Sequence, residues 1–104
     1  MSVDFTDVDI YPSFKTFTVS VTANRATQVL LPSRVKSIQV GSDSGKIYVS
    51  HAGTDGADLG TSDRGFVPNN NLLSVKLGTG AQRLSSLFVA GASGGEKVVI
   101  ILEE

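Results

Sequence analysis

Apolar and polar residues alternate along several short stretches of the chain, with the period of two that half-buried β-strands show. In residues 14–22, Phe17, Val19 and Val21 fall on one face and hydroxyl side chains on the other. This pattern predicts strands at residues 3–10, 14–22, 26–31, 34–40, 46–51, 71–77, 86–91 and 96–103. About eight short strands predict an all-β protein, an antiparallel β-sandwich or a jelly roll.

The connections between these strands are rich in turn-forming residues. "GSDSG" (41–45) and "GASGG" (91–95) each predict a hairpin between the strands on either side. The stretch 52–70 is longer than most loops, and long loops are often functional. Its simplest interpretation is a surface crossover between two sheets.

One short stretch has helical spacing. Leu84, Leu87 and Phe88 could share one helical turn, but the glycines that follow favour a strand. We therefore expect a β-sandwich domain over residues 13–104, preceded by residues 1–12 as an N-terminal arm or edge strand.

The last predicted strand is apolar on both faces. If Val99 and Ile101 point into the sandwich, then Val98, Ile100 and Leu102 point out, and the reverse leaves two apolar side chains outside. Each such side chain contributes roughly 1.5–3 kcal/mol when buried. Something is therefore expected to cover this face.

Two covers are possible from the sequence. The N-terminal segment could fold over its own sheet with Phe5, Val8, Ile10 and Phe14. Alternatively, a second subunit covers an apolar patch larger than monomers usually expose. The oligomer interface predicted on this second interpretation consists of Leu30, Leu72, Phe88, Val98, Ile100 and Leu102.

Composition narrows the possible partners. The chain has 104 residues, 40% of them hydrophobic and 18% charged, with a net charge of −1, which fits one globular domain. No basic patch for nucleic acid or anionic membrane is expected, and no apolar run is long enough to span a bilayer. The chain has no cysteine, and its acidic N-terminus does not resemble a secretory signal peptide.

Motifs for catalysis or metal binding are weak, so we expect a protein that is not an enzyme and has no cofactor. His51 is the single histidine, "GSDSG" lacks the serine of a G-x-S-x-G elbow, and "GTGAQR" (78–83) lacks the last glycine of a phosphate loop. Asp55, Asp58 and Asp63 could offer oxygen ligands to Ca²⁺, but their spacing does not match an EF-hand. Acids in such loops are usually turn-formers.

Carbohydrate binding usually needs an exposed aromatic platform. Tyr48 alternates away from its apolar neighbours and could serve, with His51 and Asp55 nearby in sequence. Phe66 is predicted to anchor the long loop rather than to bind a ligand.

Several segments together resemble small β-sandwich structural proteins of tailed bacteriophage virions. The segments are "ATQVLLPSRVKSIQV", "GKIYVS", a Gly/Asp/Asn-rich loop, "NLLSVKLGTGA" and "SLFVAGASGGEKVVIILEE", over about residues 26–103. Proteins that look like this decorate or cement capsids or form fibre and tail-tip modules, often as trimers. They carry no catalytic residues.

The resemblance implies a capsid decoration or cement protein, made in the host cytoplasm and bound to the capsid surface as a homotrimer. Its partners would be copies of itself and the major capsid protein. The N-terminal arm would contact the capsid through Val3, Phe5, Val8 and Ile10. The alternative is a receptor- or carbohydrate-binding module of a fibre or tail tip, with Tyr48, His51 and Asp55 in its ligand loop.

Overall fold

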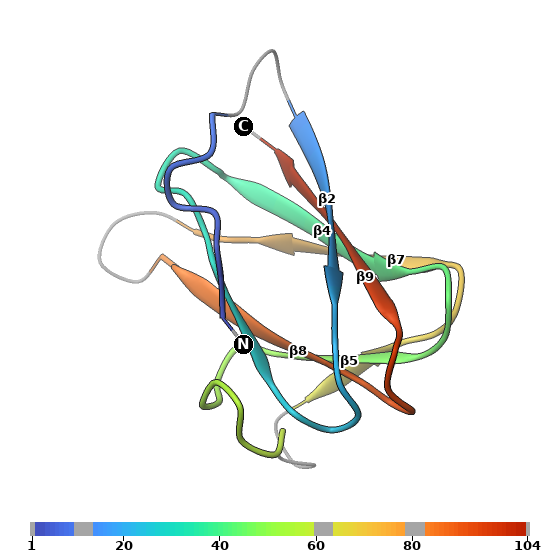
Figure 1. Ribbon diagram of the computed structural model, residues 1–104. Coiled ribbons are helices and arrows are strands. Elements are labelled where there is room, and N and C mark those ends of the chain that lie inside the picture. The colour runs from blue at the N-terminus through green and yellow to red at the C-terminus, as the bar shows by residue number, and fades with distance from the viewer. Residues whose placement is uncertain (1, 10–13, 60–63, 79–82, 104) are drawn as a thin grey trace.

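The computed structural model describes residues 2–9, 14–59, 64–78 and 83–103, and within them the protein is all-β (Figure 1). The strands are β1 (Val3–Asp4), β2 (Phe14–Ser20), β3 (Thr27–Leu30), β4 (Ser37–Ser42), β5 (Ile47–Ser50), β6 (Gly65–Val67), β7 (Asn71–Lys76), β8 (Ser86–Gly91) and β9 (Lys97–Glu103). The predicted fold class is confirmed, and 84–88 contains no helical turn. In these ranges no helix is present that could cross a membrane.

The strands form two sheets, one with the order β2-β9-β4-β7 and the other with the order β1-β3-β8-β5-β6. Four antiparallel pairs define the topology: β2 with β9, β3 with β8, β4 with β7, and β5 with β6. The chain is therefore one long antiparallel ribbon, folded so that successive segments alternate between the sheets. This is the jelly-roll arrangement of a β-sandwich.

The topology overturns two predicted connections and adds a strand to a third. Residues 41–45 and 91–95 are not hairpin loops, because each joins strands of different sheets. The segment 52–70 does link the two sheets, as predicted, since β5 and β7 lie in different sheets, but it first forms the strand β6 beside β5, which the sequence pattern missed. Glycine-rich turns suit sheet-to-sheet crossovers as well as hairpins, so their composition does not reveal which strands pair.

The side chains of β9 that were predicted to form an oligomer interface point into the core instead. Val98, Ile100 and Leu102 are completely buried within the chain, and Phe88 is only 7% exposed. These four are therefore corrected from interface residues to buried residues. Val99 and Ile101 are the apolar side chains of β9 that face outward, and both are half-buried.

The N-terminal segment closes one side of the sandwich. β1 runs parallel to β3, and the Phe5 N–H donates a hydrogen bond to the Leu30 carbonyl oxygen at 2.9 Å. The Phe5 ring is buried and stacks on Phe17 of β2 with 4.5 Å between centroids. Because Phe5 joins the edges of both sheets, it is not available to a free arm. Val3 and Val8 are half-buried against the core, and Ile10 lies outside the described residues.

A loop of the same chain covers the outer face of the five-stranded sheet. Phe88 and Ala90 of β8 form a small cluster with Ala26 and Leu59, the latter from the loop that follows β5. The backbone holds this loop in place, with hydrogen bonds from Ala26 N–H to Ala57 O at 2.8 Å and from Leu59 N–H to Asn24 O at 2.9 Å. The apolar surface of β8 therefore needs no second subunit.

Candidate interaction surface

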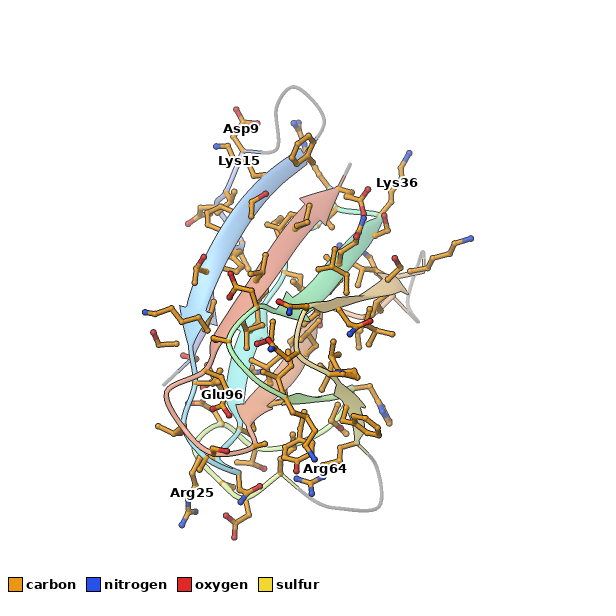
Figure 2. The ribbon with its side chains drawn as sticks, turned by 90° about the vertical axis from the view of Figure 1, so that its right-hand side faces the viewer. Asp9, Lys15, Arg25, Lys36, Arg64 and Glu96 are labelled. Carbon is orange, nitrogen blue, oxygen red and sulfur yellow. The ribbon has the colours of Figure 1, made fainter. Side chains whose placement is uncertain are left out.

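β7 is an edge strand, and most of its length is exposed. Among the described strands it pairs only with β4, and Figure 2 shows it at the right-hand border of its sheet, beyond β4. Leu72 is 54% exposed and Leu73 is 41% exposed, on opposite faces of the strand. Two of the four most exposed large apolar residues of the described chain thus lie side by side, the others being Phe14 and Phe66.

The outer face of the sheet is hollowed beside Leu72. A depression of about 190 Å³ is lined by Leu72, Val99 and Ile101 together with polar groups of Ser42, Asp43, Asn70 and Asn71. Gly41 of β4 lies opposite Leu72, and a Cβ at Gly41 would overlap the Leu72 Cδ2 atom. The missing side chain lets Leu72 lie flat over β4. This face is uncharged where Thr18, Val99, Gly41 and Leu72 align across the four strands.

The inner face of β7 borders a second hollow, of about 210 Å³, on the side of the sandwich opposite the N-terminal segment. Leu73 and Val75 form one wall. The other lining residues come from β5, β6 and β8 and from the segments beside them: Val49, Ser50, His51, Gly65, Leu84 and Leu87. Both faces of β7 are thus flanked by concave, largely apolar surface.

The predicted interface included Leu72 but not Leu73 or Val75, which alternation places together on the other face of the strand. Both do point inward, as the alternation predicts. Leu73 remains exposed because β6, at the corresponding edge of the other sheet, is only three residues long and does not cover it. The other predicted interface residue that is not fully buried, Leu30, is half-buried on β3.

The residues of the predicted ligand loop are spread over the sheet. The Asp55 carboxylate accepts a hydrogen bond from the Gln28 N–H of β3 at 3.0 Å, whereas Tyr48 lies on β5, with β8 between the two strands. His51 is exposed at the rim of the inner hollow. The Arg64 guanidinium lies 3.6 Å from the centre of the Tyr48 ring and covers it.

Phe66 does not anchor the long loop. Its ring is 64% exposed on β6, and the Lys46 ammonium lies 5.6 Å from its centre and 5.4 Å from that of Tyr48. Cation–π contacts of this kind contribute roughly 0.5–1 kcal/mol at exposed sites. The cluster is thus a second exposed feature, which we name the aromatic–cation cluster (Lys46, Tyr48, Arg64 and Phe66).

The aspartates proposed for Ca²⁺ do not gather. Asp55 is held on β3, Asp58 lies 3.5 Å from the Arg25 guanidinium, and Asp63 is outside the described residues. Within the described ranges, no group of three or more His, Cys, Asp or Glu side chains is placed to hold a metal ion.

Among the described residues Glu96 is the one buried acid, and backbone groups surround its carboxylate. Its side chain is 4% exposed, and its Oε2 atom accepts a hydrogen bond from the Ser93 N–H at 2.8 Å. Burial by itself would raise the pKa of Glu96, but the nearby backbone N–H groups of the turn, with that of Ser93 at hydrogen-bond distance, outweigh it and lower the pKa. The carboxylate therefore holds the turn between β8 and β9 as a fixed internal anion.

Comparison with solved structures finds the same architecture in a designed protein. The solution NMR structure of a de novo designed double-stranded β-helix superposes with a TM-score of 0.57 over 86% of this chain and 99% of the other, at 13% identity. At this identity the likeness establishes the fold alone. No protein-family model matches the chain, and the comparison with curated proteins finds no match.

Proposed function

We propose that the protein is a non-enzymatic structural protein of a bacteriophage virion, a capsid decoration or cement protein that acts as a homo-oligomer. The observation that carries the assembly role is β7, an edge strand with exposed leucines on both faces and an apolar hollow beside each. Contiguous exposed apolar surface is one of the marks of a protein–protein contact. The assignment to a virion rests on the sequence resemblance.

The positions of the polar side chains support a structural role. Asp55 and Glu96, which could have served in catalysis, are both engaged with backbone N–H groups. The inner faces of the sheets meet in a core whose fully buried large side chains are all aliphatic: Ile38, Ile47, Leu87, Ile100, Leu102, Val29, Val35, Val40, Val89 and Val98. Aliphatic side chains thus fill the centre of the sandwich, and the hollow of about 210 Å³ lies at its edge beside β7.

The test is to ask where the protein resides. We expect it on purified virions, bound to DNA-filled heads rather than to tails, and its removal should lower the temperature at which heads release their DNA. Its absence from particles that carry its gene would contradict the proposal. The trimer implied by the resemblance stays a prediction, and sedimentation of the purified protein measures the copy number.

The aromatic–cation cluster favours a second candidate, a carbohydrate-binding module of a fibre or tail tip. Exposed Phe66 offers a ring for stacking, and Lys46 beside it offers a hydrogen-bond donor. Binding to a glycan array that is lost in Phe66→Ala and kept in Phe14→Ala would support this function over decoration. Phe14 is the matched control because it is 57% exposed and lies at the start of the four-stranded sheet.

A further inference from the structure

Three of the four sheet edges are protected against pairing with another strand. β1 is two residues long and ends in Asp4, and β6 is three residues long and is followed by Pro68. β2 carries Lys15 opposite the inward-facing Leu102, which places a charge on the inner side of that edge. Short length, proline and inward-pointing charge all discourage edge-to-edge association. The fourth edge, β7, has six residues and neither charge nor proline from Asn71 to Val75.

The backbone of β7 leaves alternate groups unpaired. The Leu77 N–H donates a hydrogen bond to the Lys36 carbonyl oxygen at 3.0 Å, in register with the pairing of β4 and β7. In an antiparallel ladder, hydrogen-bonded residues alternate with residues that face away. The backbone N–H and C=O groups of the odd-numbered residues of β7 therefore point toward β4. The backbone groups of Leu72, Ser74 and Lys76 point toward the free edge.

We propose that two copies of this chain pair antiparallel through β7, with the two-fold axis at Ser74. This inference rests on the homo-oligomer of the proposed function and specifies its contact. In this register, the two Ser74 residues exchange backbone hydrogen bonds, and Leu72 of each copy pairs with Lys76 of the other. On the inner face, Leu73 of one copy meets Val75 of the other, and the symmetry forms this apolar pair twice.

A second copy is the occupant that the edge fits best. The inner residues Leu73 and Val75 flank Ser74 symmetrically, so the strand is complementary to itself without any unpaired inward charge. Directly opposed side chains of this kind are the unit of sheet stabilisation. Pairing would also cover Leu73, which is 41% exposed.

The pair is expected to be concentration-dependent. A single strand pair buries less than the roughly 800 Å² per partner of a standard stable interface. Sedimentation equilibrium over a range of concentrations should therefore show a monomer–dimer equilibrium. The dimer is the unit from which any larger assembly would form.

The first test removes one backbone donor. Ser74→Pro deletes an N–H that faces away from β4, so the fold should persist while dimer affinity falls at least about tenfold, because proline cannot donate to the new ladder. Ser74→Ala keeps the N–H and should dimerise like the wild type. A wild type that stays monomeric at every concentration, or a folded Ser74→Pro protein that dimerises normally, overturns the pairing.

The second test does not depend on the proline variant folding. The natural chain has no cysteine, so Ser74→Cys should form a disulfide-linked dimer under mild oxidation. Lys76→Cys should not, because its two copies would lie four residues apart along the strands, roughly 13 Å, beyond disulfide reach. Equal cross-linking of both variants overturns the register.

These results are separable from the proposed function. Protein found on heads but monomeric in solution and uncross-linked on the particle would leave the decoration role standing and reject the pairing. A β7 dimer in solution, with no protein on particles, would support the pairing and reject the decoration role.

Discussion

At the scale of single residues, the Glu96 carboxylate is bonded to the turn between β8 and β9. Its carboxylate is enclosed by the turn between β8 and β9, and a Cβ at Gly91 would overlap its Oε1 atom. The glycines predicted a turn here, but no pattern in the sequence marked the acid that holds it.

Replacing this acid is expected to destabilise the fold in a pH-dependent way. Glu96→Gln should lower the free energy of unfolding by about 1–3 kcal/mol at neutral pH, since the amide cannot accept the N–H groups as the carboxylate does. Because folding lowers the pKa of Glu96 from its ordinary 4.5, the wild-type contribution is present above 4.5 and is lost as pH falls through the folded pKa.

Urea unfolding well above and well below pH 4.5 measures this effect. The gap between wild type and Glu96→Gln should narrow in acid. Exposed Asp43 provides the control, and Asp43→Asn should change stability by less than about 0.5 kcal/mol. A gap that does not change with pH would mean that the charge of Glu96 is not what stabilises the turn.

At the scale of the elements, the pairing of β4 with β7 depends on the absence of a side chain at Gly41. A Cβ there would overlap the Asn71 carbonyl oxygen as well as Leu72. Gly41→Ala should therefore destabilise the fold by about 1–3 kcal/mol, because the backbone of β7 has to move. Thermal or urea unfolding measures the loss.

Gly65 of β6 is the matched control for this substitution. An added Cβ at Gly65 has no atom of the described structure within 4 Å, so Gly65→Ala should leave stability unchanged within about 0.5 kcal/mol. Similar losses for both variants would show that strand glycines matter for a reason other than close approach.

The elements also show how far the sequence could predict the structure. Alternation located every strand except β6, whose three residues are too few for a period to appear. It placed Phe17, Val19 and Val21 correctly on one face. It could not decide the orientation of β9, where both faces are apolar, because the decision depends on which strands lie beside it.

Strand pairing was the part that local sequence could not reveal. "GSDSG" has the composition of a hairpin loop and is a crossover, since the partner of β4 in the ribbon is β7, far along the chain. The exposure of the surface around β7 likewise depends on strands that are distant in the sequence. Leu73 alternates like a core residue, and only the short neighbouring edge of the other sheet leaves it open.

At the scale of the whole molecule, the two open sides of the sandwich differ: the N-terminal segment covers one, and exposed β7 borders the other. Phe5 closes one, and Phe5→Ala should lower the free energy of unfolding by roughly 3–5 kcal/mol, because a buried ring shared by both sheets is lost. Thermal unfolding measures the effect. Exposed Phe14 is the control, and Phe14→Ala should cost much less. Equal effects would instead favour a loosely attached arm.

The position of β8 and β9 has a consequence for biosynthesis. Each lies inside its sheet with a neighbour on both sides, yet both come from the stretch 86–103, which the ribosome adds after every strand that they join. Neither sheet can close until that stretch has been synthesised, and the nascent chain must keep its unpaired strands apart until then. A premature stop before residue 86 would leave two sheets without their centres, a product fit for aggregation or proteolysis rather than for partial function.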